Sequence, residues 1–316
     1  MMKSPFSSMP PEKVRELSRD LLLRELAQYF GAQPPPGAVE CDYSLWRCPE
    51  TGFEFAVPPR AGNRIFYEWI SSFPTYYPAF RWEYGKVRDI LAEQAGLAES
   101  PVRLLDVGCG SGEFLESLVD IPNVMGFGVD MNVSAVESCS KRGVKAFCGT
   151  IGEALKAGAF QPGQYDCVTS FHCLEHVPDP AGFLGEMLPL LKPDGRILVS
   201  TPYSPMSFET DWFDVMNHPP HHLGRWNISS YRSVAKLLGL NVRFYFPKAR
   251  SALSRALQTF RLVHLGAHRH INKVALVGLI LRRLPSFLRL WRRQAGRQTI
   301  DGATAADVIL VEFRRE

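Results

Sequence analysis

Residues 104–112 read Leu-Leu-Asp-Val-Gly-Cys-Gly-Ser-Gly, an apolar segment that runs into three glycines just before a helical pattern begins at Glu113. A strand that ends in a glycine turn and continues into a helix is typical of nucleotide-like cofactor sites in open α/β sheets. Glycines at 108, 110 and 112 let the backbone approach a ligand closely and adopt turn dihedrals that other residues resist. We therefore expect a cofactor to bind at this turn; the alternative is an ordinary tight connection without a ligand.

The spacing of the glycines indicates the kind of cofactor. A dinucleotide fingerprint, G-x-G-x-x-G, would place its third glycine at position 113, but that residue is Glu113 and the third glycine comes one residue earlier. A carboxylate at the start of a helix suits a ligand with a cationic or neutral end better than a pyrophosphate. The spacing therefore disfavours an NAD-dependent reductase.

The composition is that of a soluble globular protein whose 316 residues can bury one full α/β core and an accessory region. Seven cysteines at irregular spacing argue against a disulfide framework, so we expect a reducing compartment, the cytoplasm. The first twenty residues carry several charges and predict no secretory signal. The longest apolar run near the C-terminus, Val274–Leu281, has eight residues, too few to span a bilayer.

From position 101 onward strands and helices alternate, which predicts a parallel sheet covered on both faces. The expected strands are 102–107, 124–129, 144–148, 165–170, 195–201, 240–246 and 307–314, and the expected helices lie near 112–119, 133–142, 151–157, 180–191 and 229–238. Gly143 and Gly239 follow two of these helices, where C-cap glycines are common.

Ligands in such sheets bind beyond the carboxyl ends of the strands. Asp130 ends the second strand, twenty-four residues after Asp106, where a carboxylate can accept hydrogen bonds from both hydroxyls of a ribose. Its alternative role is to cap the helix that starts near Val133. With Asp106 two residues before its first glycine, the glycine turn resembles motif I of class I S-adenosylmethionine-dependent methyltransferases.

Two later segments extend the resemblance. The sequences Phe-His-Cys-Leu-Glu-His-Val-Pro-Asp-Pro at 171–180 and Leu-Leu-Lys-Pro-Asp-Gly-Arg-Ile-Leu-Val-Ser-Thr-Pro at 190–202 are similar to the fourth-strand and fifth-strand motifs of ubiquinone-biosynthesis-type methyltransferases. The resemblance covers about residues 100–246. It implies a Rossmann-like α/β fold, with seven strands in the order 3-2-1-4-5-7-6 and the last strand antiparallel. It also implies a methyltransferase domain over 99–316, with a basic helical insertion at about 247–306, and an accessory region over 1–98.

The same resemblance implies S-adenosylmethionine as the cofactor. The matching positions that we expect to bind it are Asp106, Gly108, Cys109, Gly110, Gly112, Asp130, Met131, Thr150, Ile151, Phe171 and His172. The acidic residue that the family usually has after the third strand is missing here. The contact with the adenine would then come from backbone or from Thr150.

Histidines gather where a methyl acceptor should bind. His172 and His176 follow the fourth strand, and His218, His221 and His222 lie in the loop after the fifth. A hydroxyl acceptor must be aligned with the methyl group and lose a proton, and a neutral imidazole can act as the base. We expect His221 or His222 to contact the acceptor as base or hydrogen-bond donor, while His176 either contacts it or only orients the turn. Adjacent histidines rarely share an ion, so no metal is expected, although the three histidines of this loop resemble a ligand set.

The accessory region is expected to contain a helix over 10–30, a β-hairpin over 39–58, and an aromatic stretch over 66–84 that leads into a helix near 85–95. Cys41 and Cys48 resemble the remnant of a zinc ribbon that some relatives carry, but two of four ligands are missing, so we expect the hairpin to pack without zinc. Tyr76, Tyr77, Trp82, Glu83 and Tyr84 are similar to a stretch that precedes motif I in these relatives. They would wall the active site or pack in the core.

One segment carries the basic charge of the chain. Residues 248–297 contain twelve Lys or Arg and no Asp or Glu, so the net charge of +4, less these twelve, leaves −8 for the rest. Leucines, a phenylalanine and Trp291 alternate with arginines from 279 to 293, which favours a helix that lies on an anionic membrane. A phosphorylated acceptor or carrier protein, or a solvated face on a packed helix, are the alternatives. No module that reads nucleic acid is recognisable, so we expect no nucleic-acid partner.

These patterns predict an enzyme that methylates a small molecule or a glycan or lipid-linked precursor, preferably on oxygen. Residues 217–226 resemble a "pro-pro-his-his, then trp" segment of methyltransferases, many of them tied to cell-surface polysaccharide or secondary-metabolite pathways. Methylation at carbon or nitrogen and a non-catalytic scaffold that keeps the fold are the alternatives. The oligomeric state and the identity of the acceptor do not follow from the sequence.

Overall fold

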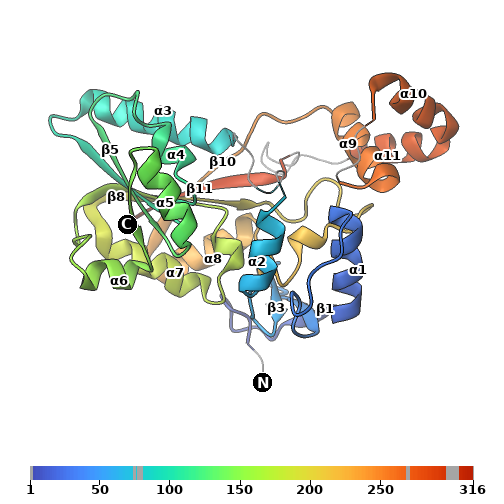
Figure 1. Cartoon of the computed structure of the whole chain (residues 1–316), viewed down its shortest axis with the longest axis horizontal. Helices are drawn as coiled ribbons and strands as arrows, with labels where there is room; N and C mark the ends of the chain where they lie inside the picture. The colour runs from blue at the N-terminus through green and yellow to red at the C-terminus, as the bar shows by residue number, and fades with distance from the viewer. Residues whose placement is uncertain (1–2, 74–75, 77–80, 268–270, 297–305, 316) are drawn as a thin grey trace.

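The structure is a computed structural model that describes residues 3–73, 76, 81–267, 271–296 and 306–315. Tyr77 of the aromatic stretch and Arg269 and Arg297 of the basic segment lie outside the described residues. The described part contains a seven-stranded sheet with helices on both faces, a four-stranded sheet, and a group of three helices at one end (Figure 1).

The seven-stranded sheet holds the core that the sequence predicts. Its strands, in the order in which they pair, are β10 (Leu240–Tyr245), β11 (Val308–Arg315), β8 (Leu191–Pro202), β7 (Tyr165–Phe171), β4 (Val102–Val107), β5 (Val124–Asp130) and β6 (Lys145–Cys148). β11 is antiparallel to both neighbours, and the other pairs are parallel. Counted along the chain from β4 and listed from the β6 edge, the order is 3-2-1-4-5-7-6. The expected α/β fold is confirmed, although β8 starts four residues earlier than predicted.

Helices cover both faces of this sheet (Figure 1). Those on one face are α3 (Trp82–Leu97), α4 (Glu113–Glu116) and α5 (Val133–Lys141), and those on the other are α6 (Ile151–Lys156), α7 (Pro180–Met187) and α8 (Ile228–Leu238). α7 is shorter than predicted because a 3-10 turn, η2 (Leu188–Leu190), follows it and leads into β8. Gly239 ends α8 in the left-handed region, as expected for a C-cap.

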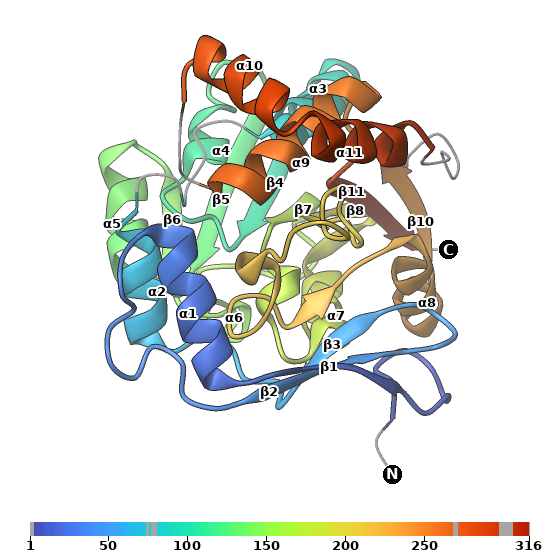
Figure 2. The same cartoon turned by 90° about the vertical axis from the view of Figure 1, so that its right-hand side faces the viewer.

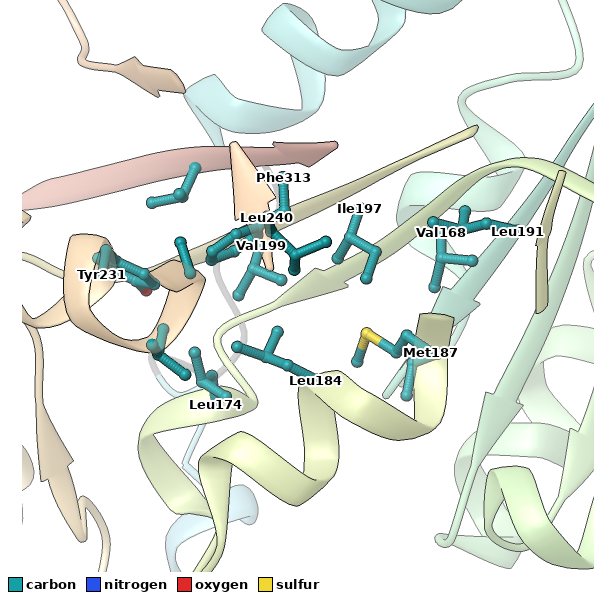
Figure 3. Close-up of a cluster of buried hydrophobic side chains, with 14 of the residues drawn as sticks. Val168, Leu174, Leu184, Met187, Leu191, Ile197, Val199, Tyr231, Leu240 and Phe313 are labelled. Carbon is teal, nitrogen blue, oxygen red and sulfur yellow. The ribbon is translucent and has the colours of Figure 1, made fainter. Parts of the chain in front are cut away.

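The apolar face of α7 shows how these layers hold together. Leu184 and Met187 point toward Val168 of β7 and toward Ile197 and Val199 of β8 (Figure 3). All five side chains are fully buried. Burial of a side chain of this size contributes about 1.5–3 kcal/mol to folding, so this contact fixes the helix on the strands whose carboxyl ends carry the candidate site.

The prediction of one helix over residues 10–30 is wrong in its first half. Residues Glu12–Leu17 form strand β1, and helix α1 (Arg19–Phe30) starts only after Ser18, whose hydroxyl accepts a hydrogen bond from the backbone N–H of Leu21 at 3.2 Å. β1 pairs antiparallel with the following hairpin, and five of its six side chains are exposed. A strand with so little buried surface leaves no alternating apolar pattern to read, which explains the error.

The predicted hairpin is present and belongs to the second sheet. Strands β2 (Tyr43–Arg47) and β3 (Glu54–Val57) pair between β1 and β9 (Gly224–Arg225), in the order β1-β2-β3-β9. Because β9 belongs to the loop after β8, this sheet joins the accessory region to the histidine loop. Helix α2 (Arg64–Ser71) follows the hairpin, and the helix predicted near 85–95 is α3. Cys41 and Cys48 are free thiols.

The basic segment forms helices α9 (Ala252–Leu265), α10 (Lys273–Arg282) and α11 (Leu284–Gly296), which Figure 2 shows along one edge of the molecule. α11 packs on α9, where the buried Arg255 donates to the Gln294 side chain at 3.0 Å and to its carbonyl at 2.7 Å. The amide of Gln294 in turn donates to the carbonyl of Ser207 at 2.7 Å. In the described residues, no helix is both long and apolar enough to cross a membrane.

Candidate active site

The glycine turn lies between β4 and α4, with all three glycines at positive φ: 75° at Gly108, 53° at Gly110 and 85° at Gly112. A Cβ at Gly108 would lie 2.2 Å from the sulfur of Cys173, and one at Gly112 would lie 2.9 Å from the sulfur of Cys139. Gly110 has no neighbour within 4 Å of that position. At Gly108 and Gly112 both the positive φ and the close neighbouring sulfur disfavour a larger residue, whereas at Gly110 only the positive φ does.

Asp130, at the end of β5, braces this turn. One carboxylate oxygen accepts from the backbone N–H of Gly110 at 2.9 Å, and the other accepts from the N–H of Asn132 at 2.8 Å. The cap of α5 is the Asn132 side chain, so Asp130 is not the helix cap that the sequence offered as its alternative role. The carboxylate thus stands at the carboxyl ends of two neighbouring parallel strands.

Asp106 is buried beneath the turn. Its side chain is 2% exposed and accepts a hydrogen bond from the hydroxyl of Thr169 at 2.7 Å. Burial raises the pKa of Asp106 to about 8, and the hydrogen bond from Thr169 offsets only part of this effect. Burial therefore favours the protonated form of this carboxyl group, which can donate as well as accept.

The other residues expected at the cofactor occupy varied positions. Cys109 is buried, whereas Met131 is 76% exposed just after β5. Thr150 caps α6, with its hydroxyl and Glu153 forming a capping box. Ile151 is buried in the core cluster. The side chains of Thr150 and Ile151 thus have structural partners of their own.

The end of β7 packs against α3 and α4. Phe171 packs against Phe114 and Tyr84, with ring centroids 4.7 and 5.0 Å apart. His172 follows with a φ of 53°, which is uncommon for a residue other than glycine. Backbone strain at the end of a strand is frequent at functional sites.

Two buried carboxylates bracket His172. Its Nε2 lies 2.7 Å from Glu83 of α3, and its Nδ1 lies 3.2 Å from Glu175. Burial alone would lower the pKa of His172, but the hydrogen bonds to Glu175 and Glu83 outweigh it and raise the pKa. Burial would likewise raise the pKa of Glu175, and the hydrogen bond with His172 holds it low instead. The three groups form a charged bridge inside the protein.

Three histidines meet beside this bridge. His176 belongs to a 3-10 turn, η1 (Leu174–His176), and His221 and His222 come from the loop after β8. The ring centroid of His176 lies 4.6 Å from that of His221 and 4.8 Å from that of His222. The rings of His221 and His222 stack with their centroids 4.4 Å apart. The structure therefore brings together the three residues that the sequence offered as catalytic candidates.

Hydrogen bonds fix the orientation of each ring in this histidine cluster (His176, His221 and His222). Nδ1 of His176 lies 2.6 Å from the carbonyl of His221, Nδ1 of His221 lies 2.8 Å from the carbonyl of Met216, and Nδ1 of His222 lies 2.9 Å from Oδ1 of Asn217. Burial lowers the pKa values of His221 and His222 well below the usual range of histidine. These two imidazoles are neutral at physiological pH.

A family model described as a methyltransferase domain matches residues 80–243, which include the glycine turn, Asp130 and the histidine cluster. That range is more than half of the chain. The chain belongs to this methyltransferase family. Its seven-stranded sheet has the order expected for that family.

Curated relatives of this methyltransferase carry the name ubiquinone biosynthesis O-methyltransferase. The protein of Burkholderia ambifaria (strain MC40-6) is 35% identical over 102 residues, which cover 31% of this chain and 44% of that protein. The protein of Bordetella pertussis (strain Tohama I) is 35% identical over 114 residues, covering 35% of this chain and 46% of that protein. The methyltransferase thus spans less than half the length of these relatives.

Solved methyltransferase structures are more distant. A SAM-dependent methyltransferase from Archaeoglobus fulgidus has a TM-score of 0.45 at 18% identity, over 73% of this chain and 94% of that one. The plantazolicin methyltransferase BpumL in complex with SAH has a TM-score of 0.46 at 15% identity, over 80% of this chain and 91% of that one.

Other features of this methyltransferase site were not predicted. His218 does not join the histidine cluster: its Nδ1 lies 2.7 Å from the carbonyl of Asp214 and its Nε2 lies 3.2 Å from Arg225. Burial lowers the pKa of His218 to about 3. The bridge from Glu83 to Glu175 was also missed, and the signal that could have found it is a glutamate inside the apolar pattern of the helix over 82–97.

Proposed function

We propose that this protein transfers the methyl group of S-adenosylmethionine to a hydroxyl oxygen of a small-molecule, glycan or lipid-linked acceptor. The single observation that carries the donor assignment is the glycine turn braced by Asp130 at the carboxyl ends of β4 and β5. Membership of the methyltransferase family supports it, and the names of the curated relatives support oxygen as the acceptor atom.

In the proposed reaction, the acceptor oxygen attacks the methyl carbon in line with the carbon–sulfur bond. The new carbon–oxygen bond forms as that bond breaks, its electron pair stays on sulfur, and the acceptor loses its hydroxyl proton. The donor is already activated, so the protein has to align the two substrates and help the proton leave. Asp130 would bind the ribose hydroxyls, and the other expected positions after β4, β6 and β7 would enclose the donor.

The histidine cluster is our candidate for the acceptor side. A carbonyl oxygen can only accept, so Nδ1 of His221 carries the proton, and its Nε2 is an acceptor that lies 3.2 Å from the hydroxyl of Tyr76. The hydroxyl of the methyl acceptor would take the place of the Tyr76 hydroxyl at this nitrogen. An imidazole of lowered pKa is a weak base. We therefore assign His221 and His222 to holding and orienting the hydroxyl, with His176 supporting them.

Release of S-adenosylhomocysteine in the presence of hydroxylated acceptors tests this function. His222→Asn keeps a side-chain N–H where Nδ1 donates to Asn217 but removes Nε2, so it should lower kcat at unchanged affinity for the donor. His264→Asn, on the remote helix α9, is the matched control and should leave turnover intact. A product methylated at carbon or nitrogen would show that the acceptor atom is not oxygen. Donor binding without methyl transfer to any class of acceptor would favour a non-catalytic scaffold role.

We also propose that the protein docks on an anionic membrane through α10 and α11. Not one side chain of α10 is buried, although its sequence is largely apolar. Val274, Val277 and Leu281 are 82%, 55% and 67% exposed and recur at helical spacing, and Trp291 of α11 is 44% exposed. This apolar surface can insert among lipid chains, and the arginines that flank it, in a segment without acidic residues, can pair with anionic lipid headgroups. The free thiols of the seven cysteines favour the cytoplasmic face.

Sedimentation with vesicles tests the membrane proposal. Vesicles that contain an anionic lipid should bind the protein, neutral vesicles should bind it less, and salt should weaken binding. Leu281→Asp should reduce binding roughly 10- to 100-fold, because a leucine loses about 1.5–3 kcal/mol of burial. Leu237→Asp is the matched control, because Leu237 is 60% exposed on α8. Equal effects of the two substitutions would exclude α10 as the docking surface and favour a different partner.

A further inference from the structure

We propose that His176, His221 and His222 form a binding site for one divalent first-row transition ion such as Zn²⁺. The expectation of no metal rested on the adjacency of His221 and His222 in the sequence. It did not include His176, which the fold brings to the same place from the turn after β7. Among the described residues, one potential ligand atom from each of the three side chains lies within 4.8 Å of the others.

The hydrogen bonds of the cluster involve the Nδ1 atoms of its rings and leave the Nε2 atoms as possible metal ligands. Carbonyl oxygens accept the Nδ1 protons of His176 and His221 at 2.6 and 2.8 Å. The Asn217 amide nitrogen donates to Glu209, which turns its oxygen toward Nδ1 of His222. Each ring therefore carries its proton on Nδ1 and a lone pair on Nε2. This pattern, in which a carbonyl or amide oxygen holds the ring nitrogen that does not bind the metal, is characteristic of metal-binding histidines.

A second observation points to a cation. Glu175 is 1% exposed, and within the described residues its Oε2 has no hydrogen-bond partner. Its Oε1 lies 3.9 Å from Nε2 of His222. Oε1 is already 3.2 Å from Nδ1 of His172, so the atom without a partner is Oε2. A buried acceptor atom needs a donor or a cation, and the carboxylate that carries this one lies beside the histidine cluster.

Binding requires a small closure of the cluster. Zn–N bonds of about 2.0–2.1 Å place tetrahedral ligand atoms about 3.4 Å apart, so the three side chains would move together by roughly 1 Å. The stacked rings of His221 and His222 would have to move out of their parallel arrangement. The Tyr76 hydroxyl, 3.2 Å from Nε2 of His221, would lose its hydrogen bond to this nitrogen, because the ion would take the lone pair. Three imidazoles leave a tetrahedral ion with a fourth position for water or substrate.

The open position connects the ion to the proposed function, on which this step of the inference rests. A hydroxyl bound to a divalent ion loses its proton more readily, because the ion stabilises the resulting oxygen anion. An acceptor oxygen held there would be a better nucleophile toward a methyl group than one held by neutral imidazoles. Metal binding itself does not depend on this consequence.

Calorimetric titration of the chelator-treated protein with Zn²⁺ tests the site without any activity measurement. The protein of residues 1–316 should bind one ion tightly, and His176→Asn, His221→Asn or His222→Asn should each weaken binding at least about 100-fold, because loss of a ligand costs more than the roughly 10- to 100-fold that loss of a ligand's hydrogen-bond partner costs. Asparagine keeps a side-chain N–H where Nδ1 donates, so these variants lose the ligand atom with little change in the hydrogen bonds. Titration with Co²⁺ should give the visible absorption of a low-coordinate ion in the wild type and not in the variants.

Controls separate this site from other zinc ligands. The double variant Cys41→Ser/Cys48→Ser and the single variant His264→Asn should bind Zn²⁺ as the wild type does. Circular dichroism and titration with S-adenosylmethionine report whether each variant is folded. Absence of tight binding by the wild type, or unchanged binding by all three asparagine variants, overturns the metal site even if methyl transfer is demonstrated. Tight binding lost only in the asparagine variants supports it even if no acceptor is found.

Discussion

Gly108→Ala should destabilise the protein far more than the same change at Gly110. Both glycines have positive φ, which costs an alanine about 1–2 kcal/mol. At Gly108 the new methyl group would also lie 2.2 Å from the sulfur of Cys173, whereas at Gly110 it meets nothing within 4 Å. Forcing an extra methyl into a packed site costs about 1–3 kcal/mol more. We therefore expect a loss of about 2–5 kcal/mol in the free energy of unfolding for Gly108→Ala, against about 1–2 kcal/mol for Gly110→Ala.

Urea unfolding of the two variants, of Cys173→Ala and of the double variant Gly108→Ala/Cys173→Ala measures these terms. The double variant should recover about 1–3 kcal/mol relative to the sum of its two single changes, because removal of the sulfur relieves the overlap and leaves only the cost of φ. If Gly108→Ala proves no more destabilising than Gly110→Ala, or if the cycle shows no coupling, close packing of the turn against the segment after β7 is refuted.

Three further changes test other contacts. Glu83→Gln should cost about 2–3 kcal/mol at pH 6 and less at pH 9 in urea unfolding. The hydrogen bonds of His172 raise its pKa against the effect of burial, so their stabilisation is complete below about pH 6.5 and is lost as the pH rises through the raised pKa. Glu312→Gln should cost about 2–3 kcal/mol at pH 7, and thermal unfolding should show this difference shrink as the pH falls below the unfolded pKa of about 4.3. Burial would raise the pKa of Glu312, but hydrogen bonds and arginines lower it, so the carboxylate stabilises the fold above its unfolded pKa and stops doing so as the pH falls through the lowered one. Arg255→Ala should weaken the packing of α11 on α9, because it removes the hydrogen bonds from Arg255 to Gln294. Amide hydrogen exchange should then become faster in α11 than in wild type, with little change in α8.

The sequence predicted the main sheet well because its central strands, β4, β7, β8 and β11, are mostly buried and read as apolar runs bounded by turn residues. The second sheet was only partly predictable. β1 buries one side chain of six, and β9 has two residues that pair with a strand about 170 positions earlier, so neither leaves a local pattern. The N-terminal strand was therefore read as part of the helix that follows it.

The cofactor turn was predictable because its chemistry is concentrated in a few consecutive residues. The histidine cluster was predictable in part, since loops that follow neighbouring strands meet at one edge of a sheet. The sequence marks Glu83 as a glutamate inside an apolar helical pattern, but it could not show that the partner of Glu83 is His172, 89 positions away. Nor could it distinguish His218, which faces Arg225, from its neighbours in the same loop.

The central claim is that the turn at 108–112 and Asp130 hold S-adenosylmethionine, and direct titration of the purified protein with this donor tests it. We predict saturable binding of one donor molecule per chain. Asp130→Ala should weaken it at least about tenfold, because the ribose would lose hydrogen bonds to a charged group worth about 1.5–3 kcal/mol. A protein that is folded by circular dichroism and yet gives no heat of binding, or an Asp130→Ala variant that binds as tightly as the wild type, would contradict the account.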